Sequence, residues 1–119
     1  MKVYIAAPWQ LRDEAQALGG RLIAAGMIIT SNWLEEPEMS FDAESATTDL
    51  NDIEASDALV LLNPAGWESK GTGGRHFECG YAHARGLSVG ILGVRSNIFH
   101  NLFTLFADET ELLECLQTF

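Results

Sequence analysis

The segments DALVLLN at residues 57–63 and GTGGRHFECGYAHARG at residues 71–86 decide the fold that we expect for this chain. The first is a short, almost wholly apolar run, which is typical of a strand buried on both faces of a sheet. The second opens with glycines and continues with a helical pattern that stops at Gly86, a residue suited to the end of a helix. A buried strand followed by a loop and a helix is the repeating unit of a parallel sheet.

The same alternation of apolar runs and helical patterns extends in both directions from these segments. Strands are predicted at residues 2–7, 27–30, 57–63 and 87–92, with a short fifth strand near 103–106. Helices are predicted at residues 11–26, 43–56 and 75–85, followed by a last helix through Leu116 that Asp108 or Thr110 can cap. We therefore expect one domain over residues 1–119, an α/β fold with a flavodoxin-like, doubly wound parallel five-stranded sheet in the order 2-1-3-4-5.

A ligand site is expected where the strand order of such a sheet reverses, beyond the carboxyl ends of the strands. This is the mouth between the first and third strands, which brings residues 4–9 near residues 63–78. The pattern of apolar residues also breaks down at SNWLEEPEMSFD, residues 31–42, which we interpret as a polar loop. A loop of that length in a compact domain is more often functional than not.

The composition limits the classes of partner. The formal net charge of −10 argues against binding polymeric nucleic acid through its phosphates but leaves a nucleoside-sized ligand open. The sequence has no apolar run long enough for a membrane span, and the chain enters a strand without a signal-peptide pattern. Cys79 and Cys115 lie in predicted helices without a disulfide framework, so we expect reduced thiols in a cytoplasmic protein.

Glu78 is the carboxylate closest to the glycines, and we place it in the first turn of its helix. The positive end of the helix dipole stabilises a charged carboxylate there, so we expect Glu78 to be ionised and able to act as a nucleophile. The alternative is a weak surface pair between Glu78 and Arg75, three residues earlier. The glycine pattern alone does not choose between them, because loop–helix junctions are often glycine-rich for packing reasons.

Asp49, Asp52 and Asp57 lie near the carboxyl-terminal half of the second helix, where acids are mildly unfavourable against the dipole. One interpretation is a solvated helix face. The other requires one of these acids to point across the sheet edge toward Glu78. A pair of carboxyls, one nucleophilic and one able to move a proton, is suited to displacement at the anomeric carbon of a sugar.

Other chemistry is less favoured by the spacing. His76 and His83 are two turns apart, roughly 10 Å along the helix axis, which is too far for one metal ion. Cys79 is a conceivable nucleophile beside a histidine, but no group that would orient the pair is apparent, and we expect a packed thiol. We therefore expect no metal and no cofactor.

Aromatic and basic residues near the expected mouth have two interpretations each. The aromatic residues are either core or loop anchors, or a pair of them brackets a flat base: Tyr4, Trp9, Trp33 and Trp67. The basic residues either meet a phosphate or offset the acids: Lys70, Arg75 and Arg95.

Three segments resemble the nucleoside 2-deoxyribosyltransferase family, including its relatives that hydrolyse deoxynucleoside 5′-phosphates: YIAAPW at 4–9, DLNDIEASDALVLLN at 49–63 and GGRHFECGYAHARG at 73–86. The segment RSNIFH at 95–100 fits the substrate loop of this family more loosely. The resemblance implies cleavage or transfer at the N-glycosidic bond of 2′-deoxynucleosides or their 5′-monophosphates. It also implies a homodimer or a higher homo-oligomer.

The resemblance implies a role for several residues. Glu78 would attack C1′ and form a covalent deoxyribosyl-enzyme, while Tyr4 would position Glu78 by a hydrogen bond. Asp49 would protonate the departing base, and its pKa would be raised by burial and by the charge of Glu78. Trp9 would belong to the base pocket, and Asn97 would reach the sugar 5′ end in the site of a neighbouring subunit.

One position departs from the family pattern. Family transferases that act on free nucleosides carry an acid six residues before the nucleophile, where this chain has Thr72. A hydroxyl beside Gly73, Gly74 and Arg75 is better suited to a phosphate or to a neutral group. The substrate is therefore either a nucleoside or a nucleoside 5′-monophosphate. Asp52 is the alternative acid and counts with these residues among the candidates for substrate binding.

The competing hypothesis from another class is a non-catalytic nucleotide-binding domain, a flavodoxin-like sensor that uses the same mouth. A structural domain without a ligand is a third possibility. Fold alone separates none of the three.

Overall fold

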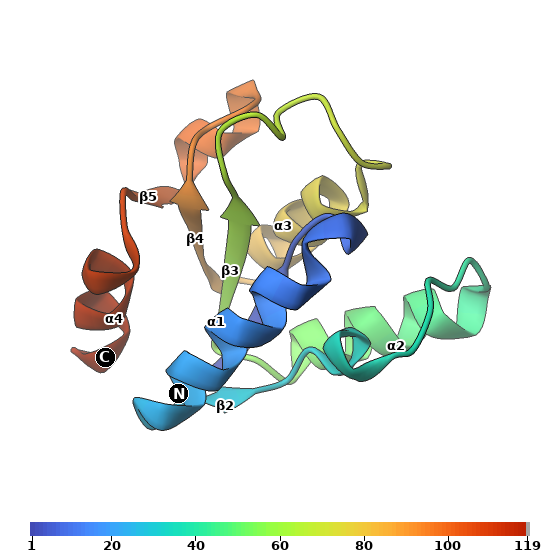
Figure 1. The fold of residues 1–119 in the computed structure, drawn as a ribbon, viewed down its shortest axis with the longest axis horizontal. Helices are drawn as coiled ribbons and strands as arrows, with labels where there is room; N and C mark the ends of the chain where they lie inside the picture. The colour runs from blue at the N-terminus through green and yellow to red at the C-terminus, as the bar shows by residue number, and fades with distance from the viewer. Residues whose placement is uncertain (119) are drawn as a thin grey trace.

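The computed structural model describes residues 1–118 and contains a parallel five-stranded sheet in the order β2-β1-β3-β4-β5 (Figure 1). Its strands are β1 Lys2–Ala6, β2 Ile28–Ile29, β3 Ala58–Asn63, β4 Ser88–Gly93 and β5 Thr104–Phe106. Every neighbouring pair in the sheet is parallel. The predicted flavodoxin-like α/β fold and its strand order are confirmed, although β2 is shorter than the predicted 27–30.

Four α-helices occupy the segments where helices were predicted: α1 Arg12–Ala24, α2 Ala43–Glu54, α3 Gly74–Ala84 and α4 Glu109–Gln117. Within residues 1–118, short 3₁₀ helices also occur before α1, between α1 and α2, and between α3 and α4: η1 Trp9–Leu11, η2 Asn32–Glu35 and η3 Ile98–Leu102. Asp108, and not Thr110, caps α4, because its carboxylate accepts a hydrogen bond from the backbone N–H of Glu111 at 2.9 Å. None of the helices within residues 1–118 has the length and apolar character that crossing a bilayer requires.

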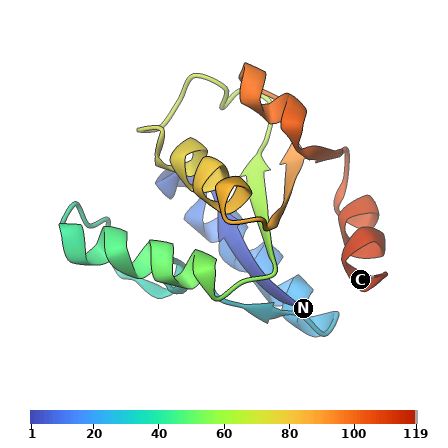
Figure 2. The same ribbon diagram turned by 180° about the vertical axis from the view of Figure 1, so that it is seen from behind.

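The helices form a layer on each face of the sheet. Figure 1 shows α1 in front of the sheet, and the reverse view in Figure 2 shows α3 in front. Arg21 of α1 pairs with Glu109 of α4 at 2.7 Å, so these two helices share a face. On the other face, Glu54 of α2 accepts a hydrogen bond from the Tyr81 hydroxyl at 2.6 Å and forms an ion pair with Arg85, at the end of α3, at 2.8 Å. These pairs are largely exposed and contribute little stability by themselves.

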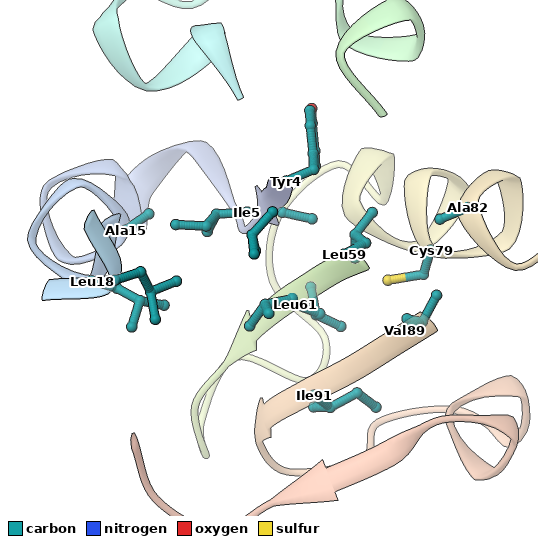
Figure 3. Packing of buried hydrophobic residues seen from close by; sticks show 14 of the residues in the cluster. Tyr4, Ile5, Ala15, Leu18, Leu59, Leu61, Cys79, Ala82, Val89 and Ile91 are labelled. Carbon is teal, nitrogen blue, oxygen red and sulfur yellow. The ribbon is translucent and has the colours of Figure 1, made fainter. Parts of the chain in front are cut away.

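The core follows from strands that are buried on both faces. Val3, Ile5 and Leu61 are completely buried. Apolar side chains of α1 and α3 pack on opposite sides of these strands, among them Leu18 and Cys79 (Figure 3). Tyr4 lies on β1, between Val3 and Ile5, but its side chain extends away from the other labelled core side chains (Figure 3). Its hydroxyl therefore reaches the site described below.

Residues 31–42 are not uniformly a polar loop, so that prediction was wrong over η2. Trp33 and Leu34 are buried. The Trp33 indole N–H donates a hydrogen bond to the carbonyl of Ile5 at 2.8 Å, and Gln16 donates one to the carbonyl of Leu34. Two apolar side chains among polar neighbours are enough to fix this segment against α1 and β1, and this fixes one wall of the site.

Candidate active site

A cavity of about 430 Å³ lies among the segments that follow β1, β2 and β3, with α2 on one side. Its walls come from Ala7–Gln10, from Trp33 and residues within 36–41, from residues within 45–50, and from residues within 72–78. Because β1 and β3 are paired neighbours, their carboxyl ends meet here, where the strand order reverses. The cavity therefore lies at the predicted mouth.

Glu78 lines the cavity, and the Tyr4 hydroxyl donates a hydrogen bond to its Oε2. The helix begins at Gly74, which puts Glu78 in the second turn, and the first turn carries no acid. Burial raises the pKa of Glu78 to about 7, while the Tyr4 hydrogen bond lowers it and the charge of Asp49 raises it. The prediction of a first-turn carboxylate with a stabilised charge was wrong, because desolvation outweighs the helix dipole at this depth.

Tyr4 remains a neutral hydrogen-bond donor. Burial is the largest cause that raises its pKa, and the neighbouring charge of Glu78 raises it further. A phenol that does not ionise can hold one oxygen of Glu78 in place and leave the other oxygen, Oε1, without a Tyr4 contact.

Asp49 faces the same cavity from α2. Its Oδ1 is buried and has no hydrogen-bond partner among residues 1–118. Burial, and then the charges of Glu36 and Asp52, raise its pKa to about 6. The predicted upward shift is present, but Glu36 and Asp52 provide the nearby charge that had been attributed to Glu78.

Arg75 is a buried cation beside the glycine-rich loop, with only 4% of its surface exposed. Its Nη2 donates to the carbonyl of Trp67 at 2.9 Å, while its Nε is buried without a partner in the described chain. Gly71 allows this approach, because a Cβ there would lie 2.6 Å from Nη1 and its φ is +85°. Arg75 does not pair with Glu78, so the surface-pair alternative is wrong for residues 1–118.

Thr72, Gly73 and Gly74 also line the cavity. Gly73 caps α3 at a φ of +89°, and no side chain caps this end of the helix. The backbone N–H groups of the first turn of a helix have no partners within the helix, so they can bind an anion.

Two of the four predicted aromatic residues reach the cavity. Trp9 and Trp33 both line it, with ring centroids 6.0 Å apart and ring planes inclined by 44°. The Arg12 guanidinium lies 4.9 Å from the centroid of Trp9. Trp67 is outside the lining, where the Lys70 ammonium lies 5.1 Å from its ring centroid.

Asp52 and Asn97 do not line the cavity of their own chain. Asp52 accepts hydrogen bonds from the backbone N–H and side-chain amide of Asn32, at 3.1 and 3.2 Å, and so holds η2 against α2. Asn97 caps η3 by accepting from the backbone of Phe99 at 2.9 Å. Arg95 donates to two backbone carbonyls near η3 and is also absent from the lining.

The histidines and cysteines form no metal site within residues 1–118. His76 contacts His100, with its Nδ1 3.2 Å from His100 Nε2, while His83 packs edge-on against Phe103. Burial raises the pKa of Cys79 to about 12, which makes it a packed thiol and a poor nucleophile. Cys79 and Cys115 are both free.

The sequence did not identify several residues of the cavity wall: Glu36, Met39, Ser40, Phe41, Ser45 and Phe77. Most of them lie in or next to residues 31–42, which were flagged only as a functional loop. A clue was that residues 31–42 combine several acids with Trp33. The contact of this segment with α2, however, is a property of the folded chain.

No family profile and no curated protein matches this sequence. Solved structures do match the fold, and one of them is a CMP N-glycosidase of Clostridium botulinum, at 18% identity over 100% of both chains and a TM-score of 0.65. A 2-deoxyribosyltransferase of Bacillus psychrosaccharolyticus matches at 20% identity over 95% of this chain and 90% of its own, with a TM-score of 0.70. A conserved protein of Enterococcus faecalis matches at 18% identity over 99% and 98%, with a TM-score of 0.77. Proteins named as a 2-deoxyribosyltransferase and an N-glycosidase therefore share the fold of this chain, in agreement with the resemblance found in the sequence.

Proposed function

We propose that this protein is an enzyme that cleaves or transfers the N-glycosidic bond of 2′-deoxynucleosides or their 5′-monophosphates through a covalent deoxyribosyl-Glu78 intermediate. One observation carries the proposal. Glu78, hydrogen-bonded by Tyr4, and Asp49, with an unpartnered buried oxygen, face one cavity from α3 and α2. The similar folds of a 2-deoxyribosyltransferase and a CMP N-glycosidase support this class of reaction.

The first step forms one bond and breaks another. Tyr4 holds Oε2 of Glu78, and Oε1 attacks C1′ of the sugar. The bond between C1′ and the base nitrogen breaks, and its electron pair leaves with the base. Asp49 donates a proton to the base, which is otherwise a poor leaving group.

The second step reverses these roles. Water, or the ring nitrogen of a second base, attacks C1′ and gives a proton to Asp49. The bond between C1′ and Oε1 breaks, and Glu78 returns to a carboxylate. Water gives hydrolysis, and a second base gives transfer.

The two carboxyls titrate near neutral pH. Their pKa values of about 6 for Asp49 and about 7 for Glu78 mean that the pair can share one proton, which in the free protein lies more often on Glu78. Turnover requires the less populated arrangement, with Glu78 ionised and Asp49 protonated. We therefore expect a bell-shaped dependence of turnover on pH with its maximum between about 6 and 7, because acid protonates the nucleophile and alkali removes the acid.

Arg75 and the glycine-rich loop favour a 5′-monophosphate over a free nucleoside. Burial lowers the pKa of Arg75, because a charged guanidinium without an anionic partner is poorly solvated there. A phosphate bound by the N–H groups at the start of α3, with Thr72 beside it, would compensate that charge. Trp9 would then stack on the base, and Asp52 would act through the pKa of Asp49 without touching the substrate.

We also propose a homodimer, with Asn97 completing the partner's site. The apolar side chains of η3 are exposed, at 75% for Ile98, 64% for Phe99 and 61% for Leu102, whereas Phe103 belongs to the core. Phe99→Asp should yield monomers in sedimentation experiments and lower turnover at low protein concentration. Full activity of a strictly monomeric protein at nanomolar concentration would contradict this assembly.

The proposed reaction is tested by chromatography. The protein is incubated with deoxynucleosides, deoxynucleoside 5′-monophosphates and their ribose counterparts, with and without a second free base. Release of the base supports hydrolysis, and a new nucleoside or nucleotide supports transfer. A ligand that raises Tm without any base release would instead support the non-catalytic nucleotide-binding domain.

A further inference from the structure

The cavity wall beside Asp49 carries another acidic side chain that no step above uses. Glu36 lines the cavity, and its negative charge raises the pKa of Asp49 more than that of Asp52 does. Glu36 and Asp49 thus line the same cavity from two segments, although they lie 13 positions apart in the chain.

The position of Glu36 is fixed by contacts on η2. Its backbone N–H donates to the carbonyl of Trp33 at 3.2 Å, at the end of this 3₁₀ helix. The buried Trp33 is in turn tied to Ile5 of β1. Asp52 binds Asn32 at the other end of the same helix. Glu36 thus projects from a segment anchored both to the sheet and to α2.

The carboxylate of Glu36 is only half-buried and has no hydrogen bond or ion pair to the described chain. Within residues 1–118 the ion pairs are Arg21 with Glu109 and Arg85 with Glu54. Two neighbouring carboxyls without a cation repel each other when both are ionised. A hydrogen-bond donor from a ligand would relieve this repulsion, whereas a ligand oxygen would add to it.

We propose that Glu36 is a specificity-determining residue that selects leaving bases with an exocyclic amino group beside a ring nitrogen acceptor, such as cytosine and adenine. The inference rests on the proposed function, in which Asp49 gives its proton to the base. The edge of the base near this wall must offer an acceptor to Asp49 and a donor to Glu36. Cytosine offers N3 with its 4-amino group, and adenine offers N7 with its 6-amino group.

The corresponding oxo bases have the wrong pattern. Uracil and hypoxanthine carry a carbonyl oxygen where cytosine and adenine carry the amino group, so a lone pair would face the Glu36 carboxylate. Uracil N3 also bears a hydrogen and cannot accept the proton of Asp49. A hydrogen bond between an amino group and a carboxylate is charge-assisted. A site that offers this bond to the amino base and repulsion to the oxo base therefore discriminates strongly against the oxo base.

The experiment compares kcat/KM within matched pairs of 5′-monophosphates: deoxycytidylate against deoxyuridylate, and deoxyadenylate against deoxyinosinate. The wild type should prefer the amino member of each pair by roughly 10- to 100-fold. Within the purine pair, Glu36→Gln should bring the ratio close to one, because an amide can both donate and accept, and Glu36→Ala should also abolish the preference. Within the pyrimidine pair both variants should lower the ratio without abolishing it, because uracil N3 still cannot accept the proton of Asp49. Glu38→Gln, an exposed glutamate of the same segment outside the cavity lining, is the control and should keep the wild-type ratio.

Two results would overturn the assignment while the proposed function stands: base release without an amino preference, or a preference for deoxyadenylate over deoxyinosinate that survives in both Glu36 variants. Failure of the proposed function is a different result, since no base would then be released from any of these substrates, and the role of Glu36 would fall with it. Thermal unfolding of each variant establishes that the ratios are measured on folded protein.

Discussion

Two partly buried polar clusters include residues of helix α3, but they differ in whether their polar atoms all have hydrogen-bond partners within the chain. In the first, the histidine cluster, Ser96 donates its backbone N–H to His100 Nδ1 at 2.9 Å, which leaves the proton of His100 on Nε2. This Nε2 lies 3.2 Å from Nδ1 of His76, and the side-chain amide nitrogen of Asn97 lies 3.2 Å from the same Nε2 and 3.4 Å from Nδ1 of His76. Burial lowers the pKa of both histidines and so favours the neutral pair. Each ring nitrogen between the two rings has a partner within the chain.

In the second, the carboxyl cluster of Tyr4, Glu78 and Asp49, one polar atom has no partner within residues 1–118, so we call this cluster open and the histidine cluster closed. Asp49 Oδ1 is buried without a partner, both carboxyls have a raised pKa, and a cavity lies between the segments that carry them. Buried polar groups are normally satisfied, so an exception beside a cavity indicates a ligand. Under the proposed function, the closed cluster maintains the fold and the open cluster performs chemistry, and each prediction below tests that division.

The largest effect should come from removal of the nucleophile. Glu78→Ala should fold and should lower kcat by a factor on the order of 10⁴ or more, because no other group can form the intermediate. Glu14→Ala, an exposed glutamate on α1, is the control and should turn over normally. Steady-state base release is the measurement, and wild-type turnover by Glu78→Ala would remove Glu78 from the mechanism.

Asp49→Asn should have the next largest effect, since it keeps the shape of the side chain but cannot donate a proton. Cleavage of purine deoxynucleotides should slow by about 10²- to 10⁴-fold. A substrate with a nitrophenolate leaving group should be affected much less, because that group leaves without a proton. Equal slowing of both substrates would mean that Asp49 holds the sugar or the fold, and the acid would then be a bound water.

The open cluster should also reduce stability as the pH rises. The pKa of Glu78 is raised to about 7 in the folded chain from an ordinary value near 4.5, so the folded state holds the extra proton between these values. Stability from this group is full below about pH 4.5 and is lost as the pH rises through 7. Glu78→Gln removes the charge, so it should be more stable than the wild type at pH 8.5 by up to about 3 kcal/mol, but not at pH 4.5.

Urea unfolding at both pH values measures this difference. A Glu78→Gln variant whose advantage over the wild type is the same at pH 4.5 and 8.5 would show that Glu78 is not a desolvated carboxyl in the free protein.

The smallest effect is expected at the closed cluster and concerns stability alone. His100→Leu leaves the N–H of Ser96 without its acceptor and removes one of the two contacts of His76 Nδ1, which should cost about 1–3 kcal/mol of the free energy of unfolding. At saturating substrate and micromolar protein, kcat should stay within a few-fold of the wild type. A variant of normal stability but with a strongly reduced kcat would place the histidine cluster in the active site and end the comparison.

The sequence was sufficient for the fold because apolar runs and helical spacing are local signals. The segments of β1, β3 and β4 and of all four α-helices could be assigned from these patterns. The capping of η3 by Asn97 also has a local signal, since Asn is a favoured N-cap residue, and it could have been found.

The pKa values of the site residues could not be predicted from local sequence patterns. The pKa of Glu78 depends on how deeply the second turn of α3 is buried, and that of Asp49 depends on Glu36, which another segment brings to it. Burial and contacts between distant segments exist only after folding. For the same reason the sequence marked residues 31–42 as functional but could not identify Glu36 within them.

Trapping the covalent intermediate tests the central claim most directly. A 2′-fluoro-substituted nucleotide destabilises the electron-poor C1′ of the second transition state, so the sugar should remain on the enzyme long enough for intact mass spectrometry. We predict a mass increase equal to the fluorinated sugar phosphate less one water, which peptide mapping places on Glu78 and which is absent in Glu78→Ala. Continued base release without any adduct, or an adduct on another residue, would contradict the account.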